Sequence, residues 1–354
     1  MNTSRKSRRA GLVGFGLLLS AVALGTTPGA AGLTRTAVQA GSTPDLQRTA
    51  TGRDGVPRAS HVFVIVGENT SLRQVTRRSA PYLAGVLRGR SARLHGLRAL
   101  RHSSSTGNYI EMTSGQSIAC ERNDSNPVNP NTDKSICHQK LNNIFHQVQG
   151  RHISWADWQE SMPHPCAFYD DGTNWAGDVY GAHHNPAIYY DNIEGNRYVE
   201  DFANPPKAVC LHHDLPMGTT APNNTRRFDR ALASGRVPRF NYVVPNDCEN
   251  GHDLCGSRSG MGQFDQFLRR EIPKIMASPA WNRRSVINVT WDEQGDATPH
   301  DRRIGSVWIG AHVKPGDYRG TWNQASLLRT VEDTFGLPHL AHARTAHPIS
   351  DIWR

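Results

Sequence analysis

Short apolar runs alternate with amphipathic stretches from residue 61 to the end of the chain. The short runs are rich in β-branched and aromatic residues, which predicts strands at residues 61–66, 152–156, 240–244, 286–291 and 306–309. The amphipathic stretches predict helices at residues 80–88, 109–113, 141–149, 226–233, 262–276 and 324–335. Because strands and helices that alternate are typical of α/β proteins, we expect a single α/β domain with a mainly parallel central sheet flanked by helices.

Two of the predicted strands stop abruptly at pairs of side chains that carry oxygen. Glu68 and Asn69 follow the first strand, and Asp292 and Glu293 follow the fourth. The carboxyl ends of parallel strands open into the crevice where α/β sheets bind their ligands, so we expect both pairs to meet there. Four oxygen donors on two strand ends suit a divalent cation. The sequence thus predicts a metal site at this edge of the sheet.

A cluster of hydroxyl residues, Ser103 to Thr106, lies between the two pairs and directly precedes a predicted helix. The free N–H groups at a helix N-terminus can hold a phosphate beside such a hydroxyl. An N-cap serine, which only begins the helix, is the commoner role for these residues.

The first forty residues have the pattern of an export signal. Four basic residues between Arg5 and Arg9 precede an uncharged apolar stretch at residues 10–25, and small residues follow. Ser7-Arg8-Arg9 resembles a twin-arginine signal, and export by the general secretory route is the alternative. We therefore expect a secreted, extracellular protein that is exported across the bacterial cytoplasmic membrane.

This pattern also predicts the domain organisation. We expect a signal peptide at residues 1–40, a flexible leader at residues 41–58 and the folded domain at residues 59–354, with insertions at about 118–138 and 164–222.

The net positive charge of the chain is small once the export signal is removed. Five of the 40 Lys and Arg residues and none of the 31 Asp and Glu residues lie in the signal, so 35 basic residues face 31 acidic ones, a net charge of +4. The arginines are scattered rather than grouped in a stripe with aromatic residues, which argues against nucleic-acid binding. No apolar run beyond the signal is long enough to span a membrane, so we expect no stable membrane insertion.

The chain has six cysteines, which an exported protein can join in three disulfides. Sequence alone allows fifteen pairings. The order along the chain suggests three local pairs: Cys120 with Cys137, Cys166 with Cys210, and Cys248 with Cys255. A zinc site is the alternative for the last pair, but its spacing is not that of a CxxC motif.

Five motifs occur in one order along the chain: residues 61–69, Ser105-x-Gly-Asn108-Tyr109 with residues 113–115, Pro245-Asn246-x-Cys248 with His252-Asp253, residues 290–293, and residues 326–338. This series resembles the phosphoesterase family of the alkaline phosphatase superfamily, which includes bacterial acid phosphatases and phospholipases C. The resemblance covers residues 61–353, and the ordered set is far more specific than any single motif. It implies an alkaline phosphatase-like fold.

The resemblance also implies a role for individual residues. Ser105, counted back from Asn108-Tyr109, would be the nucleophile, and Thr106 is the nearest alternative. A metal-held serine can attack phosphorus and form a phosphoserine, which water then hydrolyses. The implied set is Glu68, Asn69, Asp292 and Glu293 as metal ligands, His252 and His300 as catalytic histidines, and Asn108 and His184 as substrate-binding residues.

The loop before His252 departs from the family pattern. Related enzymes often have an acidic residue there, whereas this chain has Glu249-Asn250-Gly251. This difference favours one cation over two. Carboxylate and amide ligands suit Mg²⁺, Ca²⁺ or Mn²⁺, and a site that also holds histidine would accept Zn²⁺.

Together these observations predict a secreted, metal-dependent phosphomonoesterase that resembles the acid phosphatases and acts through a phosphoserine on Ser105. Its expected partner is a small-molecule phosphate ester. A phosphodiesterase of the phospholipase C type is the first alternative. The second is a secreted binding protein that retains the fold without catalysis.

Overall fold

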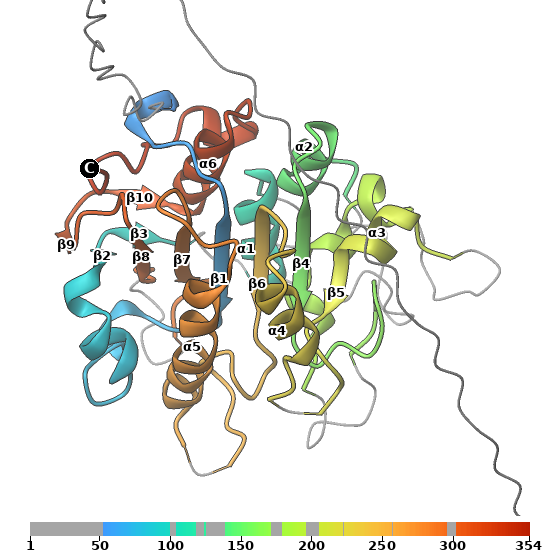
Figure 1. Ribbon diagram of the computed structural model, residues 1–354, viewed down its shortest axis with the longest axis horizontal. Helices are drawn as coiled ribbons and strands as arrows, with labels where there is room; N and C mark the ends of the chain where they lie inside the picture. The colour runs from blue at the N-terminus through green and yellow to red at the C-terminus, as the bar shows by residue number, and fades with distance from the viewer. Residues whose placement is uncertain are drawn as a thin grey trace, which may run out of the picture. The chain divides into compact units, whose positions relative to one another are not determined.

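A mixed sheet of eight strands forms the centre of the computed structural model (Figure 1). The structure describes residues 52–99, 104–117, 124, 139–170, 179–195, 205–221, 223–256, 258–295 and 302–354. The strands, in their order across the sheet, are β5 (Asp214–Pro216), β4 (Trp155–Gln159), β6 (Phe240–Val244), β1 (Val62–Gly67), β7 (Val286–Trp291), β8 (Ser306–Gly310), β2 (Ser91–Leu94) and β9 (Gly316–Tyr318).

The direction of the strands decides where a site can form. The five strands β5, β4, β6, β1 and β7 are parallel. Strand β8 is antiparallel to both β7 and β2, while β9 is parallel to β2, so β2 and β9 run in the same direction as β1. All strands except β8 therefore end at the same edge of the sheet.

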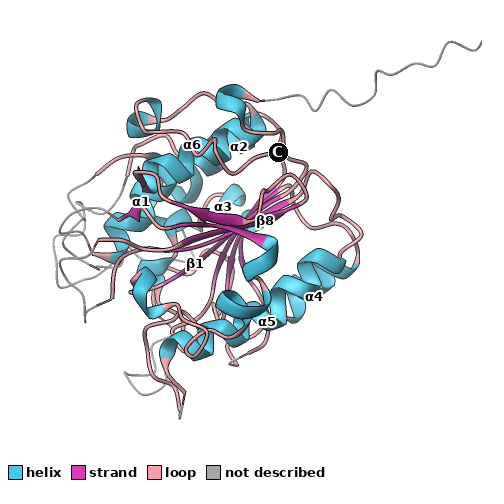
Figure 2. Cartoon of the chain, turned by 90° about the vertical axis from the view of Figure 1, so that its left-hand side faces the viewer, coloured by secondary structure: helices cyan, strands magenta, loops and turns pink. Residues whose placement is uncertain are grey.

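Helices cover both faces of this sheet (Figure 2). The first face carries α1 (Ser105–Ser114), α2 (Ile144–Gly150) and α6 (Gln324–Phe335), and the second face carries α4 (Arg226–Ala233) and α5 (Gly260–Ala277). Every residue of β1, β4, β6 and β7 is buried. Such continuous apolar strands are expected where helices cover a sheet on both sides, because neither face meets water.

The architecture confirms the predicted α/β fold with a mainly parallel sheet, and β6 and β7 have the predicted bounds. The strand predicted at residues 152–156 is wrong by three residues, because His152 has a positive φ of 54° in the turn after α2. The helix predicted at residues 80–88 is instead a short π-helical turn, Tyr82–Val86, followed by a 3₁₀ turn, Arg88–Arg90.

The stretch between residues 164 and 222, which we expected to be an insertion, also contributes a strand to the sheet. It contains α3 (Ala208–His213) and the edge strand β5, and the disulfide Cys166–Cys210 joins its start to α3, as the order of the cysteines suggested. A second, two-stranded sheet pairs β3 (Leu97–Arg98) with β10 (Trp322–Asn323). Among the described residues no helix is both long enough and apolar enough to cross a membrane.

Candidate active site

The ends of β1 and β7 bring the two oxygen-bearing pairs together. Gly67 and Trp291 are partners in the parallel register, so Glu68 and Asp292 leave the sheet side by side. Asn69 adopts a φ of 43°, a conformation that asparagine tolerates better than most residues. Its backbone N–H donates to Oδ1 of Asp292 over 3.1 Å, and its side-chain amide donates to Oε1 of Glu68 over 3.2 Å.

Helix α1 begins at Ser105, next to these strand ends. The Ser105 hydroxyl is buried and donates to Oε1 of Glu68 over 3.3 Å and to Oε1 of Glu293 over 3.5 Å. Ser104 occupies the N-cap position, but no side-chain hydrogen bond caps the helix from it. The Thr106 hydroxyl donates instead to the backbone carbonyl of His183 over 3.4 Å. Of the two neighbouring hydroxyls, only that of Ser105 contacts the acidic pairs.

His184 lies on the other side of Glu68, in a 3₁₀ turn that spans Ala182–His184. Its Nε2 atom lies 3.0 Å from Oε1 of Glu68, and its Nδ1 atom lies 3.3 Å from Oδ1 of Asp247. Only 3 % of its side chain is exposed, so the imidazole ring is fixed between the two carboxyl groups.

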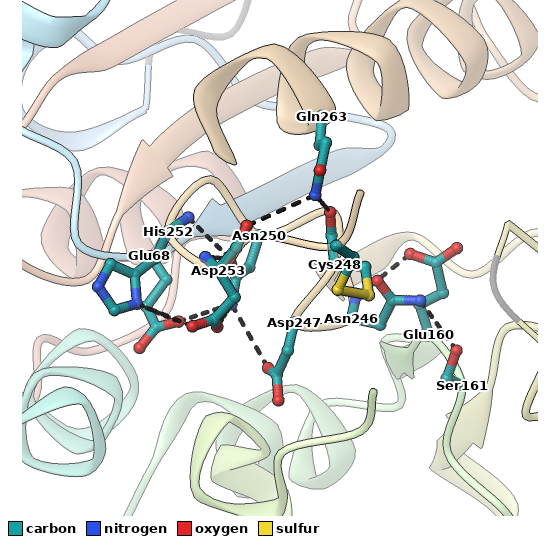
Figure 3. The surroundings of a disulfide bond; sticks show 11 residues. Glu68, Glu160, Ser161, Asn246, Asp247, Cys248, Asn250, His252, Asp253 and Gln263 are labelled. Atoms are coloured by element: carbon teal, nitrogen blue, oxygen red, sulfur yellow. Dashed lines mark hydrogen bonds and ion pairs between the residues drawn. A yellow bond between two sulfur atoms is a disulfide. The ribbon is translucent and has the colours of Figure 1, made fainter. Parts of the chain in front are cut away.

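The loop after β6 completes the site (Figure 3). The side-chain N–H of Asn250 donates to Oε2 of Glu68 over 2.6 Å, and the side-chain Oδ1 of Asn250 accepts from the backbone N–H of His252 and of Asp253. Nδ1 of His252 lies 3.9 Å from Oε2 of Glu68 and 3.3 Å from Oδ1 of Asp253. The disulfide Cys248–Cys255 closes this loop.

Gly67 allows this loop to approach β1. A Cβ atom at Gly67 would lie 2.6 Å from the backbone oxygen of Asn250 and 2.8 Å from the Trp291 ring, both far inside van der Waals contact. The space left by the absent side chain also lets the backbone carbonyl of Asn250 accept from the backbone N–H of Glu68 over 2.8 Å.

The charges in the site are strongly coupled. Burial raises the pKa of Asp292 to about 7, and the neighbouring charge of Glu68 adds to the rise. Burial also acts to raise the pKa of Glu68, but the charge and hydrogen bond of His184 outweigh it and hold this pKa at about 2. Burial acts to lower the pKa of His184, yet Glu68 and Asp247 lift it well above its ordinary value. The site thus combines a carboxylate–imidazolium pair with a carboxyl group whose pKa lies near neutral pH.

The donor set fits a divalent cation. Oδ2 of Asp292 is fully buried and accepts no hydrogen bond from the described part of the chain. A cation could take the place of the Asp292 proton, since ligating carboxylates must be deprotonated. Carboxylate, amide and hydroxyl oxygens suit hard cations. Nitrogen atoms are also close, because Glu68 forms groups of possible ligands within 4.8 Å both with His183 and His184 and with His252 and Asp253.

Not every residue that the sequence indicated reaches the centre of the site. Asn108 is buried, and its side-chain amide donates to the Ser104 carbonyl over 2.9 Å, at the start of α1. His300 lies outside the described residues. The sequence did not indicate Asp247 or His183 as site residues. It also did not predict that Asn250 contacts Glu68. The position of Asp247, three residues after β6, could have indicated it, because β6 is the parallel neighbour of β1.

The site thus holds a buried serine beside two pairs of oxygen-bearing side chains, at the carboxyl edge of a mainly parallel sheet. The chain belongs to the Phosphoesterase family, whose model matches residues 98–338. This match includes Ser105, Asp292 and Glu293, whereas Glu68 and Asn69 precede it. The predicted family and enzyme class are confirmed.

Curated relatives carry the names of phosphatases. A phosphatidylinositol-3-phosphatase from Mycobacterium tuberculosis (strain ATCC 25618 / H37Rv) is 26% identical over 299 residues, which cover 84% of each chain. An acid phosphatase from Aspergillus fumigatus is 21% identical over 68% of this chain and 48% of its own length. A phosphate-repressible acid phosphatase from Penicillium chrysogenum is 21% identical over 68% of this chain and 51% of its own length. The chain thus spans about half the length of these fungal enzymes.

Solved structures share the fold, and one of them is a protein of the alkaline phosphatase superfamily. A superfamily protein from Vibrio parahaemolyticus matches with a TM-score of 0.53 at 11% identity, over 81% of this chain and 69% of that one. Murine ectonucleotide pyrophosphatase/phosphodiesterase 5 matches with a TM-score of 0.50 at 8% identity, over 83% of this chain and 100% of that one. At such low identity these likenesses concern the fold alone, and they confirm the predicted alkaline phosphatase-like architecture.

Proposed function

We propose that the protein is a secreted, metal-dependent phosphomonoesterase that acts through a phosphoserine on Ser105. One observation carries this proposal: the Ser105 hydroxyl lies within 3.5 Å of both Glu68 and Glu293, at the point where the ends of β1 and β7 meet. Catalysis by a serine requires a hydroxyl that is activated and held in place, and the neighbouring Thr106 hydroxyl is turned toward the His183 carbonyl instead.

Two displacements at phosphorus give the overall reaction. Oγ of Ser105 attacks the phosphorus atom of the ester, the bond from phosphorus to the ester oxygen breaks, and the alcohol leaves with a proton. Water then attacks the phosphoserine, releases inorganic phosphate and restores the Ser105 hydroxyl.

The two histidines near Glu68 differ in exposure, and this difference suggests separate roles. His252 has 34% of its side chain exposed, so it can reach the alcohol and donate the proton that the leaving oxygen needs. His184 is fixed between Glu68 and Asp247 and holds the Glu68 carboxylate in position. We retain Asn108 as a residue that supports substrate binding through the start of α1, and His300 as a further catalytic histidine.

Glu68, Asn69, Asp292 and Glu293 would hold one divalent cation next to Ser105. When bound, such a cation lowers the pKa of a nearby hydroxyl and neutralises charge on a phosphoryl oxygen. The choice among Mg²⁺, Ca²⁺, Mn²⁺ and Zn²⁺ depends on how many histidine nitrogens take part.

The phosphatase names of the relatives support a monoester substrate rather than a phospholipase C type diester. The mycobacterial relative, which aligns over 84% of both chains, adds the phosphorylated inositol lipids to the substrates that we propose. Secretion is supported by the basic and apolar pattern of residues 5–25.

The test is hydrolysis of a small aryl phosphate across pH, with the metal first removed by a chelator and each of the four cations then added back. We expect chelation to abolish turnover and one cation to restore it. Glu68→Gln and Asp292→Asn should lose bound metal by elemental analysis. Full turnover by metal-free protein would refute the proposal.

A further inference from the structure

The loop that the Cys248–Cys255 disulfide closes is bound to helix α5 by side chains of that helix. Gln263 and Arg270 are seven residues apart on α5, which is about two turns, so they lie on the same face of the helix. The Gln263 amide donates to the backbone carbonyl of Cys248 and, over 3.5 Å, to that of Asp253 (Figure 3). These bonds hold both ends of the loop against α5.

Arg270 holds the same loop at Glu249. Its Nη1 donates to Oε1 of Glu249 over 2.9 Å, and its Nη2 donates to Oε2 over 2.6 Å. Such a two-point pair fixes the orientation of the carboxylate as well as its distance. Only 7% of the Glu249 side chain and 26% of the Arg270 side chain are exposed. Glu249 directly precedes Asn250, whose side-chain amide donates to Oε2 of Glu68.

Arg270 also ties the loop to the strand beside it. Its Nη2 lies 3.5 Å from Oε1 of Glu160, which directly follows β4, and its Nε donates to Oε1 of Glu271 over 2.7 Å. Oε2 of Glu160 in turn accepts from the backbone N–H of Asn246, near the start of the loop, over 3.2 Å. One guanidinium group thus contacts three buried carboxyl groups, those of Glu160, Glu249 and Glu271.

This network offers geometry more than stability. A buried ion pair gains little net stability, because the charges must first leave water, but it fixes the groups that it joins. The loop needs such fixing, since Asn250 must present its amide to Glu68 while its Oδ1 accepts from the backbone N–H of His252. Glu68 holds this residue from the side of β1, and Arg270 holds its neighbour Glu249 from the side of α5.

We propose that Arg270, acting through Glu249, is a positioning residue of the active site. It fixes the disulfide-closed loop so that the Asn250 amide meets Glu68 and His252 stays beside the site. Arg270 contacts none of the residues assigned to catalysis or to metal binding, so its effect passes through Glu249. The effect on turnover rests on the proposed phosphomonoesterase activity, whereas the effect on the loop does not.

Glu249→Gln and Arg270→Lys test the pair. Glu249→Gln keeps the shape of the side chain and removes its charge and one of its acceptor oxygens. We expect kcat/KM for an aryl phosphate to fall about tenfold, as for other residues that orient the ligands of a metal. Arg270→Lys should give a similar loss, since an ammonium group keeps the charge but lacks the fork of the guanidinium group. Neither change removes the cation from the buried carboxyl groups, so we expect both proteins to fold. A wild-type kcat/KM in either variant would overturn the proposal.

Lys274→Gln is the matched control. Lys274 lies about one turn further along α5 and contacts Glu271 over 3.1 Å and Asp229 over 2.9 Å, neither of which belongs to the loop. The change therefore removes a charge from the same network without touching Glu249. We expect the control to keep the wild-type kcat/KM. A loss as large as that of Glu249→Gln would show that any damage to the network lowers turnover, which would overturn the positioning role.

A double-mutant cycle asks whether Glu249 acts through Asn250. If it does, Glu249→Gln should cause little further loss of kcat/KM in protein that already carries Asn250→Ala, because the contact that it positions is gone. A merely structural role would give the same factor in both backgrounds. Losses that multiply in this way would contradict the proposal.

Hydrogen exchange separates this inference from the proposed function, since it needs no turnover. The backbone N–H groups of His252 and Asp253 donate to Oδ1 of Asn250. We expect both to exchange about tenfold faster in Glu249→Gln than in the wild type, and Lys274→Gln to leave their rates unchanged. Absence of phosphatase activity in the wild type would refute the phosphomonoesterase, whereas unchanged exchange in Glu249→Gln would refute only the positioning role.

Discussion

The side-chain amide of Asn250 donates a hydrogen bond of 2.6 Å to Oε2 of Glu68, across 182 residues of sequence. The other end of the same amide accepts from the backbone of His252 over 2.8 Å and of Asp253 over 3.3 Å. Asn250 therefore couples the proposed metal ligand on β1 to the loop that presents His252. An acidic residue at this position would face Glu68 with a like charge.

Asn250→Asp tests this coupling with little change of shape. The carboxylate can still accept from His252 and Asp253, but it replaces the donor to Glu68 with a repelling charge. We expect kcat/KM for an aryl phosphate to fall about 10- to 100-fold, as for other residues that orient metal ligands, while the melting temperature changes little. Asn282→Asp, the same change at an exposed position before β7, is the control. Unchanged kinetics in Asn250→Asp would contradict the coupling.

The disulfide Cys248–Cys255 should matter more for catalysis than for stability. It closes a loop of only 7 residues in sequence separation, so replacing both cysteines by serine should cost roughly 2 kcal/mol of unfolding free energy. The His252 loop would lose its fixed position, and kcat/KM should fall by more than tenfold in protein that is still folded. Denaturant unfolding and steady-state kinetics measure the two effects.

The second disulfide gives the matched comparison. Cys166–Cys210 spans 44 residues, so its removal should cost more unfolding free energy, roughly 4 kcal/mol, and should change kcat/KM less. If the short loop lost stability but kept its full kcat/KM, the loop would not position His252.

We expect Asp157 and Asp214 to make the stability of the fold depend on pH. They are partners on β4 and β5, both are fully buried, and each has one oxygen that accepts no hydrogen bond from the described residues. Burial raises the pKa of Asp214 to about 7 and that of Asp157 well above its ordinary value. The folded state therefore binds more protons than the unfolded state, so the contribution of the pair is fully present below about pH 4 and is lost as pH rises to about 7.

Asp214→Asn removes this titration while keeping the shape. The difference in unfolding free energy between pH 4 and pH 7, on the order of a few kcal/mol for the wild type, should become smaller in the variant. Denaturant titrations at the two pH values measure it. The same difference in unfolding free energy between pH 4 and pH 7 in the two proteins would contradict this account.

Strong apolar patterns allowed much of the fold to be predicted from the sequence. Strands β1, β6 and β7 are continuous buried runs, and the register of β1 with β7 brings Glu68 to Asp292 as the acidic pairs suggested. The short strands β2, β5 and β9 are only three or four residues long and carry polar side chains, so no alternation of apolar and polar residues marks them in the sequence. Their place is set by pairing with neighbours rather than by local propensity.

The parts of the site that come from loops could not be predicted. Asn250 looked like a substitution in an otherwise acidic loop, and only the approach of that loop to Gly67 reveals its hydrogen bond with Glu68. A cavity on the α5 side of the sheet is lined by six arginines, and the sequence did not indicate it because these arginines come from segments as distant as residues 73 and 319. Scattered charges in a sequence become a patch only when the fold brings their segments together.

Substitution of the nucleophile should separate chemistry from folding. We expect Ser105→Ala to lower kcat by orders of magnitude while metal content and melting temperature stay close to those of the wild type. Thr106→Ala should have a mild effect, because that hydroxyl contacts the His183 carbonyl rather than the carboxylates. A collapse of kcat in Thr106→Ala with an active Ser105→Ala would move the nucleophile by one residue.

The most direct test of a phosphoserine mechanism is to trap the intermediate. Enzyme mixed with a ³²P-labelled aryl phosphate is quenched in acid within the first turnover, digested and mapped by mass spectrometry. Our account predicts a covalent phosphate on Ser105 in the wild type and none in Ser105→Ala. Phosphate on Thr106, or rapid turnover that leaves no labelled peptide under any quench condition, would contradict it.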